Sequence, residues 1–501
     1  STSLSESGRG PPLRLAQTLS HMPEQTYEPV IGLEIHVQLK TQTKMFCASP
    51  TAYGGPPNTQ VCPVCLGLPG ALPTVNGRAV ELGVKAALGL GATVHGTSVF
   101  ARKSYFYPDL PKGYQITQHD RPLATDGAVD VPSAGGTARH VRIRRLHLEE
   151  DSGKSLHDRV EGATAIDLNR AGTPLLEIVT EPDLASPADA RAFLTQLKQA
   201  LAYLDVSDCN MEEGSLRVDA NVSLRRPGGG EGGTRTEIKN LNTFSGIEKA
   251  LAFEVERQSR VLAGGGEVRP ATLLWDAARG EAREIRGKED GGDYRYFPEP
   301  DLPPLVLEDS WIDGVRRSLP EMPAKRVARF VEEYGITPGH AAVLTGTRDL
   351  ADYYEAVARC GVSCQEAANW VMGEVLAAIN AQSCALPQFR VRPRDLADLI
   401  AMMDEGILSR PAARQVFARM AETGEPPAQI VGEAGLGRVA DAAAVSAWVD
   451  EALAAYPAEA ERLRAGDAKL SAFFVGRVMN LSGGVADPAQ VNSALKEKLG
   501  G

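Results

Sequence analysis

VIGLEIHVQL, residues 30–39, alternates strictly between apolar and polar side chains. The apolar positions share one parity and are Ile31, Leu33, Ile35, Val37 and Leu39. A period of two is typical of a half-buried β-strand, so we expect this parity to face a hydrophobic core. The other parity carries Glu34 and His36, which would lie roughly 7 Å apart on one face. Such a pair could hold a metal ion, or it could be the solvated side of an ordinary strand.

Three later segments repeat this pattern: RRLHLEEDSGK (144–154), TPLLEIVTEPD (173–183) and NMEEGSLRVDANVSLRR (210–226). The first ends in the acidic run Glu149, Glu150 and Asp151, and the second carries Glu177. Several strands with one polar face predict an antiparallel sheet whose open face lines a cleft. Converging carboxylates repel each other and favour a hard cation such as Mg²⁺. Surface strands with solvated charges remain the alternative.

The composition is that of a globular protein without a strong positive field. The chain has 501 residues, 43% hydrophobic and 23% charged, with a formal net charge of −11. This length predicts two to four domains, and the acidic balance excludes a whole-protein attraction to nucleic acid. No apolar run is long enough to predict a membrane span. Seven cysteines in a chain of this length favour a reducing, cytoplasmic compartment over a disulfide framework.

The character of the sequence changes along the chain. Residues 1–26 are expected to form a flexible extension. A strand-rich body is expected over 27–305, with helical patterns at 78–90, 187–204 and 244–262 and a turn-rich end at GGDYRYFPEPDLPPL. Helical periodicity then predicts a middle domain over 306–425 and, after the break at TGEPP, a small helical tail over 426–501.

A possible metal knuckle and a set of cations complete the candidates. Cys62 and Cys65 form a C-x-x-C pair with Cys47 upstream, a spacing that suits Zn²⁺, although Ala48 and Ser49 follow Cys47 and no fourth thiol is present. A three-cysteine zinc site and a relic site without metal are both compatible with this pattern. No GxxxxGK[ST] loop occurs, so a bound nucleotide would need metal and side-chain cations. The candidate cations are Lys103, Lys112, Arg145, Arg170, Arg217, Lys239 and Arg295.

The motifs together resemble a known family. The runs YEPVIGLEIHVQL, PNTQVCPVCLGLPGALPTVN, ARKSYFYPDLPKGYQITQ, LHLEEDSGKS, DLNRAGTPLLEIVTEPD, MEEGSLRVDANVSLR, EIKNLNTF and DYRYFPEPDLPPL closely resemble the B subunits of tRNA-dependent aspartyl/glutamyl amidotransferases. The resemblance extends from about Tyr27 through the helical tail. It implies an α+β chain whose sheet-rich cradle domain is similar to the glutamine synthetase catalytic fold, followed by an all-helical middle domain and a small helical tail.

The resemblance also implies an activity. The chain would use ATP and Mg²⁺ to phosphorylate the side-chain carboxylate of Glu or Asp mischarged on tRNA(Gln) or tRNA(Asn). Ammonia would then displace phosphate. An amidase A subunit would release that ammonia from glutamine, and a small C subunit would hold the two larger subunits together in a heterotrimer.

Site residues follow from the same resemblance. The Mg²⁺ ligands would be Glu34, His36, Glu150 and Glu177, with Lys239 as a catalytic cation. Glu149, Asp151, Glu212 and Glu213 would bind a second metal or support the first. Beyond what the resemblance implies, phosphate contacts are expected from Lys103, Arg145, Arg170, Lys239 and Arg295. The family's zinc knuckle uses four cysteines, whereas this chain has Ser49 where the fourth is expected.

The tail carries seven Lys/Arg and nine Asp/Glu between residues 426 and 501, so it would bind tRNA by shape with a few placed cations. The candidates are Lys469, Arg477, Lys496 and Lys498. Two other functions stay open on the sequence alone. A ligase acting on a small free amino acid would turn over without tRNA, and a non-catalytic tRNA scaffold would tolerate alanine at Glu34 or Glu150.

Overall fold

The structure is a computed structural model that describes residues 27–132, 138–229, 232–287, 294–434, 442–483 and 486–499. The chain divides into two compact units, Ser1–Met322 and Pro323–Gly501. The predicted N-terminal extension, residues 1–26, lies outside the described residues.

The first unit is built on a nine-stranded sheet with the strand order β14-β13-β12-β11-β1-β10-β7-β6-β2. Its strands are β1 (Glu28–Gln38), β2 (Thr93–Val94), β6 (Ala124–Val131), β7 (Arg139–Glu150), β10 (Pro174–Thr180), β11 (Leu216–Arg225), β12 (Thr236–Leu241), β13 (Ala271–Asp276) and β14 (Glu281–Gly287). Neighbouring strands run antiparallel except β12 and β13, which are parallel. The sheet is therefore mixed, and the predicted antiparallel sheet is confirmed for the strands around β1.

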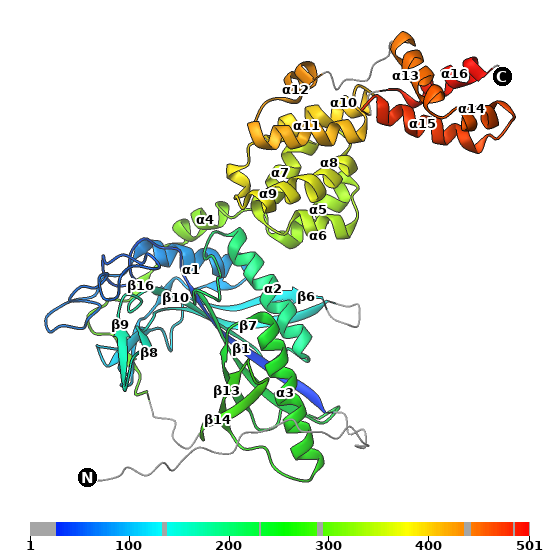
Figure 1. The fold of residues 1–501 in the computed structure, drawn as a ribbon. Helices are drawn as coiled ribbons and strands as arrows, with labels where there is room; N and C mark the ends of the chain where they lie inside the picture. The colour runs from blue at the N-terminus through cyan, green and yellow to red at the C-terminus, as the bar shows by residue number, and fades with distance from the viewer. Residues whose placement is uncertain are drawn as a thin grey trace. The chain divides into compact units, whose positions relative to one another are not determined.

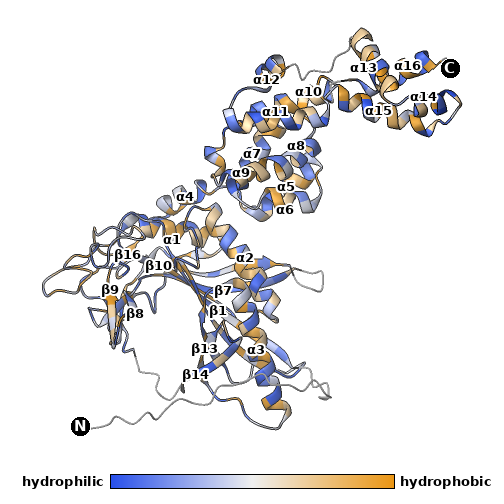
Figure 2. Ribbon diagram, viewed as in Figure 1, coloured by the Kyte–Doolittle hydropathy of each residue, from blue (hydrophilic) through white to orange (hydrophobic). Residues whose placement is uncertain are grey.

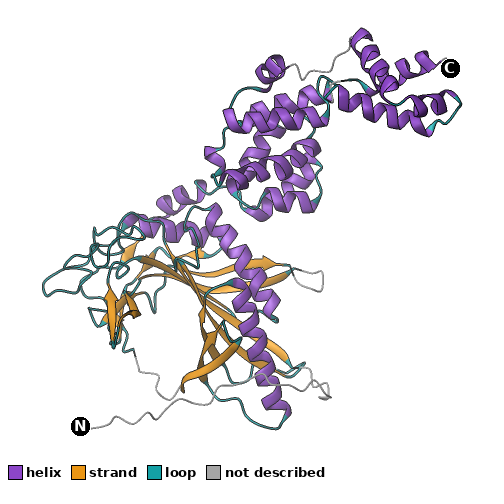
Figure 3. Cartoon of the chain, viewed as in Figure 1, coloured by secondary structure: helices purple, strands orange, loops and turns teal. Residues whose placement is uncertain are grey.

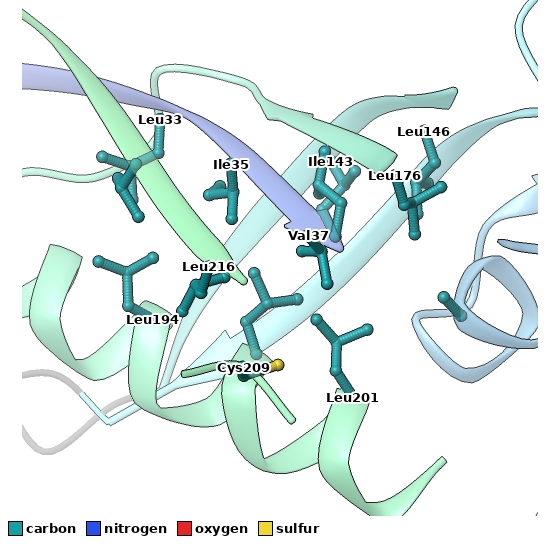
Figure 4. Packing of buried hydrophobic residues seen from close by; sticks show 14 of the residues in the cluster. Leu33, Ile35, Val37, Ile143, Leu146, Leu176, Leu194, Leu201, Cys209 and Leu216 are labelled. Carbon is teal, nitrogen blue, oxygen red and sulfur yellow. The ribbon is translucent and has the colours of Figure 1, made fainter. Parts of the chain in front are cut away.

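The predicted alternation of β1 sets the two faces of this sheet. Leu33, Ile35 and Val37 are buried, and they lie with Leu194 and Leu201 of the covering helix in one hydrophobic cluster (Figure 4). Burying each such side chain contributes roughly 1.5–3 kcal/mol. The polar parity of β1 therefore lies on the opposite face, which the helices leave open (Figure 3).

Three helices cover the apolar face: α1 (Gly77–Gly89), α2 (Pro187–Tyr203) and α3 (Phe244–Ala263) (Figure 1). They lie within a residue or so of the predicted ranges. The side chain of Ser186 accepts a hydrogen bond from the Asp189 backbone N–H, and Pro187 occupies the first turn, as the capping pattern predicted. Gly264 follows the last residue of α3 and ends that helix.

Smaller elements complete the first unit. They are β3 (Thr97–Ser98), β4 (Ala101–Ser104), β5 (Tyr114–Thr117), β8 (Lys154–Val160), β9 (Ala163–Asp167), β15 (Phe297–Pro298), β16 (Leu305–Val306) and α4 (Asp309–Arg317). We expected the body to end at residue 305. Val315 of α4 instead belongs to the buried core of the first unit, which ends at Met322. An isolated helix of nine residues is marginal in water, so α4 needs this packing.

The second unit is helical, as predicted for the sequence after residue 306. Its helices are α5 (Pro323–Tyr334), α6 (Pro338–Leu344), α7 (Arg348–Ala358), α8 (Cys364–Trp370), a π-helical stretch (Val371–Val375), α9 (Leu376–Gln382), a 3₁₀ turn (Leu386–Gln388), α10 (Pro393–Asp404), α11 (Arg410–Thr423), α12 (Pro427–Ala434), α13 (Ala442–Ala455), α14 (Pro457–Arg464), α15 (Lys469–Leu481) and α16 (Pro488–Leu499). Hydrophobic and hydrophilic positions intersperse along these helices (Figure 2).

Two separate hydrophobic clusters lie in the second unit. The larger contains residues from Phe330 to Ile430, and the smaller contains residues from Val445 to Leu495. The observed fold is thus a mixed sheet body with an all-helical C-terminal region. The proposed boundary between a middle and a tail domain at residue 425 and the likeness to glutamine synthetase stay predictions. Within the described residues, no helix is both long and apolar enough to cross a membrane.

Candidate active site

A row of charged and titratable side chains crosses the open face of the sheet. Across strands β11, β1, β10 and β7, Arg217 lies opposite His36, His36 opposite Glu177, and Glu177 opposite His147. Residues directly opposite each other on adjacent strands point to the same face. The three segments that the sequence analysis singled out therefore meet where β1 and its neighbours pair.

Two imidazoles converge on one carboxylate in this row. The Nε2 atoms of His36 and His147 lie 3.4 Å and 3.2 Å from Oε2 of Glu177. Glu149 spans the same two rings, with Oε1 3.5 Å from His36 Nε2 and Oε2 3.6 Å from His147 Nε2. Glu34 Oε1 lies 3.8 Å from His36 Nε2. We call Glu34, His36, His147, Glu149 and Glu177 the acidic–histidine cluster.

Burial and mutual charge set the protonation states within the cluster. Burial disfavours the imidazolium of His147, but Glu177 and Glu149 outweigh this effect and raise the pKa of His147 to about 9. Burial would raise the pKa of Glu177, yet the charge and hydrogen bond of His147 and His36 hold this pKa well below its usual value. Burial, together with the charge of Glu177, raises the pKa of Glu34. The carboxylates thus favour the protonated form of His147, and the imidazoles favour the ionised form of Glu177.

Glu149 occupies the position in the cluster that we had expected for Glu150. Glu150 has the same parity as the buried Leu146 and Leu148, so it points to the other side of β7. Its carboxylate accepts a hydrogen bond from the Ile116 N–H at 2.9 Å and forms an ion pair with Lys112. The structure therefore brings together three of the four expected Mg²⁺ ligands, and Glu150 instead holds the segment that contains β5.

His147 is the cluster residue that the sequence analysis missed. The signal for it was present, because His147 shares a parity with Glu149 in an alternating strand whose other parity is Leu146 and Leu148. Its side chain is 2% exposed, and its Nδ1 atom has no hydrogen-bond partner in the described part of the chain. A buried histidine on the polar face of a sheet indicates a functional site more strongly than an exposed histidine does, because burying an imidazole requires a compensating charge.

The cluster has the chemistry of a divalent metal site. Two overlapping sets offer ligand atoms within 4.8 Å of one another: Glu34, His36 and Glu177, and His147, Glu149 and Glu177. Carboxylate oxygens are the ligands that Mg²⁺ prefers, and the imidazoles also suit Mn²⁺. The residues present therefore fit a divalent ion.

Two of the expected cations flank the cluster. Lys103 on β4 has its ammonium 4.9 Å from the ring centre of Tyr294. Burial would lower the pKa of Lys103, but the charges of Glu149 and others, including Glu177, raise it above its usual value. Lys239 on β12 lies 2.8 Å from Asp219 and 3.0 Å from Glu237. Asp219 is opposite Glu34, so Lys239 stands one strand further from the cluster.

The other expected cations take different positions. Arg145 donates from Nη1 to the His119 carbonyl at 3.4 Å. Arg170 donates to the carbonyls of Ser152 and Gly153 at 3.1 and 2.6 Å. Arg295 lies with the aromatic residues of a cavity of about 330 Å³, lined by Ser104, Tyr105, Phe106, Lys112, Gly113, Arg295 and Phe297. The structure does not group Arg295 with the cluster.

The three cysteines converge in the loop after β1. The sulfur atoms of Cys47, Cys62 and Cys65 lie within 4.8 Å of one another, so they could hold a metal ion. The Ser49 hydroxyl is 4.0 Å from Cys65 Sγ, where a fourth sulfur would complete a closed zinc site. A hydrogen bond from Cys47 lowers the pKa of Cys65 to about 4.

A buried cation accompanies this sulfur cluster. The ammonium of Lys44, which is fully buried, lies 3.6 Å from Cys65 Sγ. The pKa of Cys47 is raised, chiefly because its thiol hydrogen-bonds to Cys65.

The expected tRNA contacts in the tail are not equivalent. Lys469 and Lys496 are exposed and form no ion pair in the described part of the chain. Lys498 forms an ion pair with Asp450 and donates to the Ser446 carbonyl at 3.1 Å. The guanidinium of Arg477 lies 4.7 Å from the ring centre of Tyr456 and 5.1 Å from that of Phe473.

Comparison with known proteins gives the family. Residues 29–313 match the family described as the GatB/GatE catalytic domain, and residues 352–499 match the GatB domain. The B subunit of the aspartyl/glutamyl-tRNA(Asn/Gln) amidotransferase from Moorella thermoacetica is 50% identical over 475 residues, which cover 94% of this chain and 100% of that protein. The chain belongs to the amidotransferase B-subunit family.

Other relatives in this family are similar to the chain over nearly its full length. The corresponding protein of Halorhodospira halophila is 50% identical over 477 residues, covering 95% of this chain and 99% of the relative. That of Prosthecochloris aestuarii is 48% identical over 474 residues, covering 95% and 98%. The resemblance inferred from the motifs is confirmed, and so is the prediction that the chain is an amidotransferase subunit.

Proposed function

We propose that this chain uses ATP to phosphorylate the side-chain carboxylate of Glu or Asp mischarged on tRNA(Gln) or tRNA(Asn), and then forms the amide with ammonia. The observation that carries the proposal is the convergence of two histidines and three carboxylates on the open face of the sheet. Bringing three carboxylates together costs stability because like charges repel, even with two imidazoles between them, and such a cost is typical of a site that is kept for function. A scaffold that only bound tRNA would have no need for it.

The chemistry requires activation because a carboxylate does not react with ammonia. A carboxylate oxygen attacks the γ-phosphorus of ATP, the bond to the bridging oxygen breaks, and ADP leaves. Nitrogen of ammonia then attacks the acyl carbon, phosphate leaves with the bonding electrons, and a base takes the extra proton. The chain's own contribution is positioning and electrostatics, which dominate catalysis of phosphoryl transfer.

A divalent ion would be held by Glu34, His36 and Glu177, with Glu149 and His147 beside them. When bound, the ion would offset the negative charge of the phosphate groups. His36 must be neutral to act as a ligand, so metal binding should weaken on acidification. Five cations are proposed to contact phosphate groups: Lys103, Arg145, Arg170, Lys239 and Arg295.

The family membership supports a proposal for the subunit architecture. The names of the relatives describe one component of an amidotransferase that acts on aspartyl- or glutamyl-tRNA. We propose an amidase A subunit as the source of ammonia from glutamine, and a small C subunit as the third member. The helical tail is proposed to bind the tRNA, and the sulfur cluster is proposed to bind a soft metal such as Zn²⁺ through three sulfurs.

The test is phosphate release from γ-labelled ATP by the assembled complex, with and without mischarged tRNA. The wild-type chain would be compared with Glu177→Gln, which removes the carboxylate shared by both ligand sets. Release that requires both mischarged tRNA and Glu177 is expected. Release without tRNA would point to a small-molecule ligase, and equal release from both proteins would place the chemistry elsewhere.

A matched control is Glu248→Gln. Glu248 lies on α3, on the covered side of the sheet, and forms a surface ion pair with Arg191 at 3.0 Å. Surface pairs of this kind contribute about 0–1 kcal/mol, so this variant should release phosphate like the wild type.

A further inference from the structure

A cavity of about 760 Å³ lies on the open face beside the acidic–histidine cluster. It is lined by Gln38, Thr51, Ala52, Tyr53, Gly54, Gly55, Lys154, Asp167, Asn169, Arg170, Thr173, Met211, Glu212, Glu213, Gly214, Arg217, Asn242 and Thr243. This volume is in the range of pockets that bind small ligands. The cavity adjoins the cluster because Arg217 in its wall lies directly opposite His36.

One part of the wall is a fixed positive charge. Nη2 of Arg217 lies 2.7 Å from Oδ1 of Asp151, whose side chain is 2% exposed. The second oxygen of Asp151 accepts a hydrogen bond from Nε2 of Gln38 at 3.0 Å. Asp151 thus anchors the guanidinium, while 37% of the Arg217 side chain stays exposed to the cavity. Arg217 is held in place but can still bind an anion.

Another part of the wall is negative. Glu212 and Glu213 are exposed in the turn before β11, and no ion pair engages either of them within the described residues. The turn is closed by a hydrogen bond from the Ser215 N–H to the Asn210 carbonyl at 2.9 Å, and Gly214 adopts a positive φ of 79°. The carboxylates are therefore carried on an ordered turn that leads directly into the strand of Arg217.

This combination of charges matches one chemical group. We propose that the cavity receives the aminoacyl group of the mischarged tRNA, with Arg217 binding its side-chain carboxylate and Glu212 and Glu213 binding its α-ammonium. This assignment rests on the proposed function. An amino acid esterified through its α-carboxyl group keeps one cation and one anion, and the acidic turn and Arg217 offer the opposite charges. The wall also contains Lys154, Asp167 and the proposed phosphate contact Arg170. ATP carries no ammonium, so the acidic turn does not suit it.

The position of Arg217 also fits the reaction. Directly opposite residues on antiparallel strands have Cβ atoms about 4.5–5.5 Å apart, so a carboxylate at Arg217 lies next to His36 and the proposed metal ligands. The amide product has no charge on its side chain. Arg217 would therefore favour binding of the carboxylate substrate over the product and assist product release.

The first test addresses the α-ammonium and uses equilibrium binding of tRNA to the assembled complex without ATP. The probes are Glu-tRNA(Gln) and its N-acetylated form, which lacks the positive charge. With the wild type, acetylation should weaken binding roughly ten- to a hundredfold. In the double variant Glu212→Gln/Glu213→Gln, the two probes should bind alike. An equal loss in both proteins would mean that acetylation acts by bulk, and it would overturn the proposal.

The second test addresses the carboxylate. The wild type should bind Glu-tRNA(Gln) more tightly than Gln-tRNA(Gln), and Arg217→Gln should remove this preference. Because Arg217→Gln leaves Asp151 without its closest partner, Arg217→Lys serves as a variant that keeps a charge there and should keep part of the preference. Unchanged discrimination in Arg217→Gln would overturn the assignment of Arg217.

Charge-matched controls are Arg226→Gln and Glu161→Gln, both exposed and outside the cavity wall. They should leave both preferences as in the wild type. Because the binding tests need no ATP, they report on the cavity even if phosphate release fails. Failure of the proposed function and failure of this inference are therefore distinguishable.

Discussion

Nε2 of His147 lies 3.2 Å from Oε2 of Glu177, and both side chains are buried on the polar face of a sheet. This contact joins neighbouring strands β7 and β10 at the point where His36 approaches from β1. A protonated His147 would keep Glu177 ionised, and an ionised Glu177 is what a metal ligand must be. Under the proposed function, this pair keeps one of the metal ligands ionised.

Replacing His147 should weaken the cluster without removing a ligand of the first set. In His147→Gln a neutral amide takes the place of the imidazole, so charged hydrogen bonds worth roughly 1.5–3 kcal/mol are lost. We expect the turnover number to fall about tenfold or more and the affinity for Mn²⁺ to change, measured by metal titration. His140→Gln is the matched control, since His140 is exposed on the same strand and contacts Asp130. Equal effects of the two substitutions would contradict the role of His147.

Substitution of Glu149 should affect metal binding, whereas substitution of Glu150 should affect stability. Glu149→Gln should lower metal affinity and phosphate release while the protein stays folded, because Glu149 contacts both imidazoles. Glu150→Gln should instead lower the free energy of unfolding by about 1–3 kcal/mol, because Lys112 and the Ile116 N–H lose a charged partner. Metal titration and urea unfolding of both variants separate the two effects. The reverse pattern would show that Glu150 is the ligand.

The sulfur cluster makes a metal-binding prediction of its own. Ser49→Cys supplies a fourth sulfur close to Cys65 and should raise the affinity for Zn²⁺ or Co²⁺ well above that of the wild type. The sulfur-to-cobalt charge-transfer absorption should also increase. Cys384→Ser, far from the cluster in sequence, serves as the control. Identical metal titrations for wild type and Ser49→Cys would mean that residue 49 does not lie at the fourth position.

The second unit should lose stability in acid through Glu355. Burial would raise the pKa of this carboxylate, but hydrogen bonds from Arg329 and Arg326 lower it to about 2 from the usual 4.5. A lowered pKa means that the stabilisation is present above about pH 4.5 and is lost as the pH falls toward 2. Glu355→Gln should be less stable at pH 7, by roughly 2–3 kcal/mol, and less sensitive to acid between these values. Urea unfolding followed by circular dichroism at several pH values checks this, and equal stability at pH 7 would refute it.

Substitution of Lys469 or Lys496 should affect tRNA binding, whereas substitution of Lys498 should affect stability as well. Lys469 and Lys496 are exposed and form no ion pair among the described residues, so alanine at either position should raise the Michaelis constant for tRNA and reduce the salt dependence of binding by about one unit of slope. Lys498→Ala also breaks an ion pair with Asp450 and should change thermal stability as well. Unchanged tRNA binding after the first two substitutions would show that Lys469 and Lys496 do not contact the tRNA.

The sequence predicted the local parts of this account better than the long-range ones. Alternation fixed which parity of β1 is buried, and Ser186–Pro187 marked the start of α2. The alternation along β7 also places Glu149, and not Glu150, on the polar face. We had instead assigned the metal ligand among the three consecutive acidic residues from the family resemblance. The contact of Asp151 with Arg217 joins residues far apart in the chain, and it depends on the order of strands in the sheet. A single sequence does not specify that order.

The most direct test of the central claim follows the oxygen atoms. Glutamate labelled with ¹⁸O in its side-chain carboxylate would be charged on tRNA(Gln) and given to the assembled complex with ATP and glutamine. An acyl phosphate requires that one carboxylate oxygen leaves with the phosphate. We predict one ¹⁸O in inorganic phosphate for each amide formed, and no label above background with Glu177→Gln. Amide formation with unlabelled phosphate would contradict the account.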